Sequence, residues 1–292
     1  MTCIYSRRLV LIALLSATAA GACAAPSQAI PRPGSVQPTQ PGTTQVPPGH
    51  PEWWLPEPGS AWQWQLSNPE IEVSSGVDVY DIDLFEGAAR TVEDLHAAGI
   101  RVLCYLNAGS WEEWRPDADD FPSAVRGKPY QGWPGEYWLD IRQLEVLGPI
   151  MEARLDLCRD KGFDGVEPDN IDGYQNETGF PLTYQDQLAY NLWLADQAHQ
   201  RGLAIGLKND SSQAADLAAA FDFALTEDCF ADGWCGDLAP FLETGKAVFA
   251  AEYTDRMTVR RFQNGVCPQA AELGISAILK RRSLDSWLEL CP

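Results

Sequence analysis

The sequence has 292 residues, of which 45% are apolar, and this is enough for one large domain with its own core. Its formal net charge at pH 7 is −20, so nucleic acid is a poor partner, because few basic side chains could neutralise phosphates. The same charge would attract a cationic substrate over long distances, although acidity is also a common adaptation to solubility or habitat.

The first 22 residues resemble a secretory signal peptide. Arg7 and Arg8 precede an apolar run of about a dozen residues, which is too short to cross a membrane as a stable helix, and small residues follow it. Cleavage before Cys23 would expose the cysteine that bacterial lipoproteins acylate, whereas cleavage at a small-x-small site near Ala22 or Ala24 would release an ordinary secreted protein. We expect an exported bacterial protein, either extracellular or attached to a membrane through a lipid on Cys23.

Residues 23–52 form a proline-rich spacer. Eight prolines occur in the 26 residues from Pro26 to Pro51, with Gln, Thr, Ser and Gly and almost no large apolar side chains. Because such a segment cannot bury a core, we predict a disordered or polyproline-like linker that would hold a domain away from a membrane. The folded domain is therefore predicted to cover residues 53–292.

Six of the eight cysteines lie in the predicted folded domain. An even number of cysteines in an exported domain indicates disulfides, and six cysteines allow fifteen pairings. A zinc site is disfavoured because the chain lacks C-x-x-C spacing and clustered histidines. The pairing that we favour closes a short loop, pins the C-terminal tail and links a strand to the following helix: Cys229–Cys235, Cys267–Cys291 and Cys104–Cys158.

Strand and helix signals alternate along the predicted domain. Short apolar runs indicate strands, amphipathic segments indicate helices, and glycines recur where a helix gives way to a strand. The predicted strands cover residues 61–66, 77–82, 101–106, 163–167, 203–207, 221–226, 247–251 and 275–279. The predicted helices cover residues 91–98, 144–161, 184–201, 212–220, 238–244 and 258–273.

This alternation predicts an α/β fold with a parallel sheet. Eight strand–helix units over about 235 residues fit a single closed (β/α)8 barrel, the TIM-barrel fold. The alternative is an open doubly wound sheet, which should carry a glycine-rich dinucleotide loop after an early strand. The sequence contains no G-x-G-x-x-G motif, so the barrel is favoured.

One connection is much longer than the others. About 35 residues, from 107 to 141, separate the third strand from its helix, and they are rich in Trp, Tyr and Phe. In a barrel this loop lies on the catalytic face, where aromatic rings can stack on the apolar faces of sugars. The alternative is a small satellite core that only folds the loop onto the barrel.

Carboxylates accumulate where the predicted strands end, which is where reactive residues project in this fold. Glu167, Asp169 and Asp172 follow the fourth strand within six residues, and further acids follow strands two, six and seven. Helix capping explains some of these acids, but it does not explain their accumulation at four strands.

Other chemistries lack their usual residues. His50 lies in the spacer, and His96 and His199 lie late in helices, so a Ser-His-Asp hydrolase or a His-ligated metal site has little to work with. The chain has no G-x-S-x-G motif and no phosphate loop. An all-carboxylate magnesium or calcium site stays open. Hydrolysis of a glycosidic bond by two carboxylates needs none of the missing parts, so we expect neither a cofactor nor a metal.

Several sequence blocks together resemble glycoside hydrolase family 114. The blocks are Gly165–Asp172, Gly206–Asp210, Glu227–Phe230 and Val248–Tyr253, with Asp78–Phe85 and Cys104–Ser110 matching in order and spacing. The resemblance runs from about Trp53 to Leu279 and implies a (β/α)8-barrel endo-α-1,4-polygalactosaminidase. It implies a substrate that is a cationic, galactosamine-containing polysaccharide with α-1,4 linkages, and it places the catalytic carboxylates on Asp169 and Glu227.

We favour Asp169 as the nucleophile and Glu227 as the acid/base. A separation of about 5 Å between the two carboxylates would indicate retention of configuration, and about 6.5–9.5 Å would indicate inversion. Residues near strand ends and in the long loop are expected to bind substrate or, alternatively, to form a hydrogen-bonded ring at the barrel mouth. They are Asp81, Tyr105, Asn107, Trp111, Glu167, Asn170, Asp172, Lys208, Asn209, Glu252 and Tyr253.

Two other functions stay open at this point. A carbohydrate-binding lipoprotein could use the same barrel without catalysis, and a glycosidase of the same fold could act on another polysaccharide. We expect a monomer in each case. Release of reducing ends from a galactosamine polymer, compared with binding alone, separates these possibilities.

Overall fold

The structure is a computed structural model, and it describes residues 53–67, 70–71, 73 and 76–292. The predicted signal peptide, Cys23 and the proline-rich spacer lie outside the described residues, so they stay predictions. Within the described part of the chain, no helix is both long and apolar enough to span a membrane.

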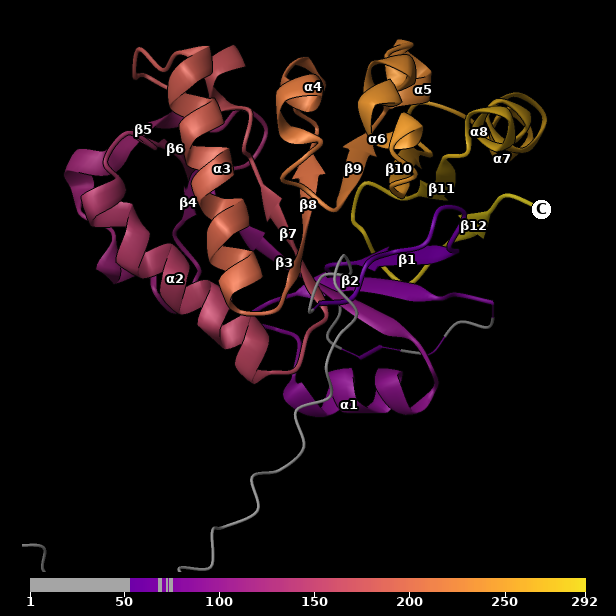
Figure 1. The fold of residues 1–292 in the computed structure, drawn as a ribbon, viewed down its shortest axis with the longest axis horizontal. Helices are drawn as coiled ribbons and strands as arrows, with labels where there is room; N and C mark the ends of the chain where they lie inside the picture. The colour runs from indigo at the N-terminus through magenta and orange to yellow at the C-terminus, as the bar shows by residue number, and fades with distance from the viewer. Residues whose placement is uncertain (1–52, 68–69, 72, 74–75) are drawn as a thin grey trace, which may run out of the picture. The chain divides into compact units, whose positions relative to one another are not determined.

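The described chain is centred on a nine-stranded sheet (Figure 1). Eight strands run parallel to their neighbours, and a short ninth strand pairs antiparallel with the eighth. In sheet order they are β1 (Trp62–Gln65), β2 (Val79–Asp83), β3 (Arg101–Asn107), β7 (Gly165–Asp169), β8 (Ala204–Lys208), β9 (Phe223–Glu227), β10 (Val248–Tyr253), β11 (Ser276–Lys280) and β12 (Glu289–Leu290). All eight predicted strands are confirmed, within two residues at each end.

Helices flank the curved sheet, as expected for a (β/α)8 barrel (Figure 1). They are α1 (Ala89–Ala97), α2 (Leu144–Asp160), α3 (Tyr184–Gln200), α4 (Ala214–Leu217), α5 (Cys229–Asp232), α6 (Ala239–Glu243), α7 (Val259–Arg261) and α8 (Cys267–Leu273). The helix predicted over 258–273 is divided, because a π-helical segment, Phe262–Val266, separates α7 from α8. The helices predicted over 212–220 and 238–244 are shorter than expected.

The two long helices form for reasons that the sequence contains. On α2, Leu147, Met151 and Leu155 recur every four residues and are buried, so one face packs on the sheet. The helix α3 begins at a capping box, in which the Thr183 side chain accepts from the Asp186 N–H and the Asp186 carboxylate accepts from the Thr183 N–H. This pair of contacts satisfies two backbone donors and fixes the start of the helix.

The core has two layers, because side chains alternate between the two faces of each strand. On β9, Phe223 and Leu225 point into the barrel, whereas Ala224 belongs to the layer between sheet and helices. Gly206 on the neighbouring strand makes room for Phe223, since a Cβ at Gly206 would lie 2.3 Å from the Phe223 ring. Burying one such aromatic ring stabilises the fold by about 1.5–3 kcal/mol.

Side chains and the C-terminal segment close the barrel between β1 and β11. The Trp62 indole N–H donates to the Ser276 carbonyl at 2.9 Å, which links the two strands directly. Beyond β11, the carbonyl of Leu284 accepts from the backbone N–H of Leu66 at 3.0 Å. The segment that ends in β12 therefore fills the seam between the first and the last parallel strand.

The long connection between β3 and α2, residues 108–143, contains an antiparallel sheet that the sequence did not predict. We call this connection the insert. Its strands are β4 (Ser110–Glu112), β5 (Arg126–Pro129) and β6 (Glu136–Leu139), in the order β4-β6-β5. Phe121 and Trp138 of the insert are buried, whereas Trp114 and Trp133 are each 51% exposed. The insert thus has a small core and also presents aromatic rings to the outside.

The three predicted disulfides are present. Cys104–Cys158 joins β3 to α2, Cys229–Cys235 closes the turn around α5, and Cys267–Cys291 ties α8 to the C-terminal tail. Each bridge joins elements that lie apart in the sequence or encloses an irregular loop, so all three restrict the unfolded chain.

Candidate active site

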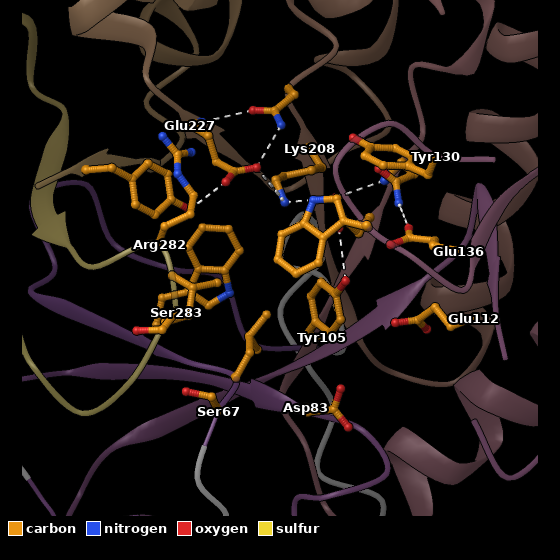
Figure 2. A pocket seen from close by; sticks show the side chains of 18 of the residues that line it. Ser67, Asp83, Tyr105, Glu112, Tyr130, Glu136, Lys208, Glu227, Arg282 and Ser283 are labelled. Carbon is orange, nitrogen blue, oxygen red and sulfur yellow. Dashed lines mark hydrogen bonds and ion pairs between the residues drawn. The ribbon is translucent and has the colours of Figure 1, made fainter. Parts of the chain in front are cut away.

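A cavity of about 490 Å³ lies at the C-terminal ends of the parallel strands, between the barrel and the insert (Figure 2). This is the end at which TIM barrels carry their active sites. Eight of the thirteen predicted site residues line it. They are Tyr105, Asp169, Asn170, Asp172, Lys208, Asn209, Glu227 and Tyr253.

Lys208 holds the two predicted catalytic carboxylates close together. Its ammonium nitrogen lies 2.8 Å from Asp169 Oδ1 and 3.4 Å from Glu227 Oε2. Because both oxygens contact one atom, these two oxygens are at most about 6 Å apart, which is close enough for the two carboxyl groups to act on one glycosidic bond. The side chains of Asp169 and Glu227 are 20% and 27% exposed, so both carboxylates are accessible from the cavity.

Asp169, at the end of β7, is fixed by hydrogen bonds to both of its oxygens. The Tyr105 hydroxyl donates to Oδ2 at 3.0 Å, and the Asn170 N–H donates to Oδ1 at 2.9 Å. Asn170 has a left-handed backbone with φ of 61°, which turns the chain sharply at the strand end. Asn tolerates this conformation better than most residues do.

Glu227, at the end of β9, is positioned by the neighbouring strands on both sides. The Tyr253 hydroxyl donates to Oε1 at 2.5 Å, and the Asn209 amide donates to Oε2 at 3.1 Å. The guanidinium of Arg282 lies 3.6 Å from the centre of the Tyr253 ring, which braces that ring against Glu227. Asn209, like Asn170, has a positive φ, so strands β7 and β8 end in the same type of turn.

The charge on Lys208 is maintained by its surroundings. Its side chain is 1% exposed, and burial lowers the pKa of Lys208. The charges of Asp169, Glu167 and Glu227 raise the pKa by more than burial lowers it, so it stays well above its usual value. The ammonium also lies 4.6 Å from the centre of the Trp64 ring. Lys208 is therefore a fixed positive charge between the two carboxylates, and it lies nearer to Asp169 than to Glu227.

Asp81 and Glu167 lie below Lys208, inside the barrel, and do not line the cavity. Both are fully buried, and the Lys208 ammonium donates to Glu167 Oε1 at 2.8 Å. Burial, reinforced by the charge of Glu167, raises the pKa of Asp81 well above its usual value. Burial raises the pKa of Glu167 to about 7, although Lys208 acts in the opposite direction. Neither Asp81 oxygen has a hydrogen-bond donor among the described residues, and burial together with the charge of Glu167 favours the neutral form of Asp81.

Three other predicted substrate-binding residues also lie outside the cavity lining. Glu252 accepts from the N–H groups of Phe230 and Ala231 at 2.8 and 3.1 Å, so it fixes the start of α5. The indole of Trp111 donates to a backbone carbonyl at 2.9 Å and packs under the Arg126 guanidinium inside the insert. For these residues the structure corresponds to the alternative expectation, a hydrogen-bonded framework around the barrel mouth.

Asn107 belongs to the same framework and connects the barrel to the insert. Its amide donates to Glu136 Oε1 at 2.9 Å, and its oxygen accepts from the Ser110 N–H at 2.8 Å. Glu136 itself lines the cavity, and so do Tyr130 and Trp133, although none of the three was predicted as a site residue. The long aromatic-rich loop was the available signal, but it pointed to Trp111 rather than to these side chains.

No cluster of three or more metal-ligating side chains occurs in the part of the chain that the structure describes.

The family model of glycoside-hydrolase family GH114 matches residues 43–292. The chain belongs to family GH114. It is therefore a glycoside hydrolase, and the predicted TIM barrel is confirmed.

Solved structures agree with this family. The GH114 chain is similar to Aspergillus fumigatus Ega3, solved in complex with galactosamine, with a TM-score of 0.78 and 38% identity over 82% of this chain and 97% of that chain. It shares its fold with the glycoside hydrolase domain of PelA from Pseudomonas aeruginosa, with a TM-score of 0.61 and 15% identity over 81% of this chain and 99% of that chain. Among curated proteins, none matches the sequence significantly.

Proposed function

We propose that this GH114 enzyme hydrolyses α-1,4 linkages in a galactosamine-containing polysaccharide, with Asp169 and Glu227 as the catalytic pair. The observation that carries the proposal is the pair of accessible carboxylates that one buried ammonium, Lys208, holds at most about 6 Å apart in the cavity. The substrate class is supported by the complex of Ega3 with galactosamine, because that protein is 38% identical over almost its whole length. The net charge of −20 also favours a cationic polymer.

The geometry favours Asp169 as the nucleophile. Lys208 lies closer to Asp169 than to Glu227, at 2.8 Å against 3.4 Å, and stabilises the ionised carboxylate that attack requires. An Asp169 oxygen attacks the anomeric carbon while Glu227 donates its proton to the departing glycosidic oxygen, so the C–O bond breaks as the glycosyl ester forms. Glu227 then removes a proton from water, which attacks the anomeric carbon and releases Asp169. Two inversions give net retention.

Substitution of the two carboxylates tests the assignment. We expect Asp169→Asn and Glu227→Gln each to lower the turnover of galactosamine oligomers by at least about 1,000-fold, because each removes a group that bonds to the reacting atoms. Release of reducing ends measures this rate. Glu152→Gln is the matched control, since Glu152 is exposed on α2 and does not line the cavity, and its rate should stay within about twofold. Normal turnover by either catalytic variant would refute the pair.

The two roles can be separated from each other. An Asp169→Ala protein supplied with azide should form a glycosyl azide of inverted configuration, because the small anion replaces the missing nucleophile. A Glu227→Ala protein should keep much of its first step on substrates with an activated aryl leaving group, which needs no protonation. With the wild-type enzyme, proton NMR should show the α-anomer as the first product. A β-anomer as the first product would rule out the double displacement.

Export is supported by the three disulfides, because such bridges form in oxidising compartments. Attachment through Cys23 is a separate proposal that rests on the sequence pattern alone. Metabolic labelling with a tagged fatty acid should mark the wild-type protein and leave a Cys23→Ser protein unmarked. Absence of label in the wild type would leave an ordinary secreted enzyme.

A further inference from the structure

Glu136 occupies an unusual position in the wall that the insert contributes to the cavity. It is the first residue of β6, it lines the cavity, and only 6% of its surface is exposed. The amides of Asn107 and Asn170 each donate to its Oε1 at 2.9 Å, and the Ser110 hydroxyl donates to the same oxygen. Glu136 is therefore held rigidly from the barrel and from the insert at once.

The negative charge of Glu136 is not balanced by the protein. Its hydrogen bonds come from neutral groups and fall on Oε1, and no Lys or Arg among the described residues forms an ion pair with it. Figure 2 shows its carboxylate beside Tyr130, facing the open space of the cavity. A buried carboxylate without a cation is costly, and a neutral glutamine would hold the same three donors.

Two other carboxylates of the cavity, Glu112 and Asp228, differ in this respect. Glu112, on β4 of the same wall, binds the Arg115 guanidinium through two contacts of 2.6 and 2.9 Å. Asp228, on the opposite wall, accepts from Arg282 at 3.0 Å. These acids are neutralised by the protein itself, so Glu136 is better suited to receive a positive charge from a ligand.

The neighbouring side chains suit a sugar that carries such a charge. Tyr130 and Trp133 line the cavity next to Glu136 in the insert, and Trp133 is half exposed. Aromatic faces pack against the apolar face of a pyranose ring and also attract ammonium groups. A ring that stacks on this wall would bring its amino group toward Glu136, whereas an N-acetyl group would offer only a neutral amide.

We propose that Glu136 binds the ammonium group of a hexosamine unit and makes the enzyme select units with a free amine over N-acetylated ones. This inference rests on the proposed function and assigns its specificity to one residue. Burial raises the pKa of Glu136 to about 7, with Asp169 and Glu112 acting in the same direction. A bound ammonium would lower that pKa again, so the free amine and the ionised Glu136 stabilise each other.

The test compares Glu136→Gln with Glu112→Gln, two identical changes on adjacent strands of one wall. For each protein, kcat/KM is measured on galactosamine oligomers and on N-acetylgalactosamine oligomers of equal length. We expect Glu136→Gln to lower the ratio of the two values by about 10–100-fold, since a charge-assisted hydrogen bond to the amine is lost. Glu112→Gln should change both values by a similar factor. An unchanged ratio in Glu136→Gln would overturn the inference, and a folding defect alone cannot shift a ratio.

A binding measurement separates this inference from the proposed function. Galactosamine and N-acetylgalactosamine are titrated into Asp169→Asn protein, with and without the added Glu136→Gln change. Preferential binding of galactosamine that disappears with Glu136→Gln supports the inference even if the wild type cleaves no polymer, a result that would refute only the proposed function. Equal loss of both sugars, or loss of neither, in a wild type that does cleave the polymer would refute only the role of Glu136.

Discussion

The floor of the cavity and the wall supplied by the insert balance their charges in different ways. On the floor, the ammonium of Lys208 lies within reach of both Asp169 and Glu227, so negative charge there has a partner within the protein. On the wall, Glu136 is held by neutral donors and lies among aromatic rings. Among the described residues, the barrel thus pairs its cavity carboxylates with a cation of its own, whereas the insert leaves Glu136 without one.

The largest effect is expected from removing the ammonium group of Lys208, which lies between Asp169 and Glu227. A Lys208→Met change leaves Glu167 and Asp169 buried or half-buried without their cation, so we expect turnover to fall by at least about 1,000-fold and unfolding to become easier by about 3 kcal/mol. Turnover assays and urea titrations measure the two losses. Lys128→Met is the matched control, because Lys128 lies in the insert and is 55% exposed, so its change should alter neither quantity appreciably. Retained activity in Lys208→Met would show that the carboxylates do not depend on this ammonium.

An intermediate effect is expected from substitutions of Asp81, which lies with Glu167 inside the barrel beneath Lys208. Asp81→Asn keeps a neutral hydrogen-bond donor for Glu167, so it should keep activity within a few-fold, whereas Asp81→Leu removes the donor and should lower activity by about 10–100-fold. The pKa of Asp81 is higher in the folded protein than in the unfolded chain, so the folded protein binds an extra proton. Wild-type stability therefore falls as pH rises from about 4 toward the folded pKa of Asp81.

The side chain of the Asp81→Asn protein does not titrate, so this variant lacks the pH-dependent loss of stability that Asp81 causes in the wild type. The unfolding free energy of Asp81→Asn relative to wild type should therefore increase with pH, by up to about 1.4 kcal/mol per unit. Urea titrations between pH 5 and pH 9 check the slope. A wild type and a variant that respond identically to pH would mean that Asp81 is ionised in the folded protein. Infrared absorption of a protonated carboxyl group at pH 7, absent in Asp81→Asn, provides an independent check.

The smallest effect is expected on the wall at Trp133. Trp133→Ala removes a half-exposed ring that lines the cavity, so KM for galactosamine oligomers should rise about two- to fivefold while kcat changes little. Steady-state kinetics on oligomers of increasing length measure this. Trp114→Ala, which removes the other half-exposed ring of the insert, shows whether the contribution is specific to one position. A fall in kcat alone would instead place Trp133 with the reacting groups of the floor.

The barrel could be predicted from the sequence because its signals are local and repeated. Each strand is a short apolar run, and glycines such as Gly162 and Gly202, both with positive φ, end the helices that precede strands. The insert strands gave no such signal. They are three or four residues long, and β5 contains Gly127 and Pro129, which are uncommon in strands.

The site was predictable to the extent that strand geometry determines it. Asp169, Lys208 and Glu227 end parallel strands, and the C-terminal ends of such strands converge in a barrel. The same rule predicted that Glu252 binds substrate, but its carboxylate accepts hydrogen bonds from the N–H groups at the start of α5 and does not line the cavity. Glu136 could not be found in this way, since its position depends on how the insert folds and on contacts with Asn107 and Asn170.

The closure of the barrel seam has a consequence for how the protein is made. The backbone contact between Leu66 and Leu284, together with β12, joins the beginning of the domain to its end across more than two hundred residues. During synthesis, which proceeds from the N-terminus, β1 therefore waits for nearly the whole domain before its outer edge is covered. The order of translation thus leaves an unpaired edge exposed longest at β1, the place where a chaperone or a premature partner strand would have the most time to bind.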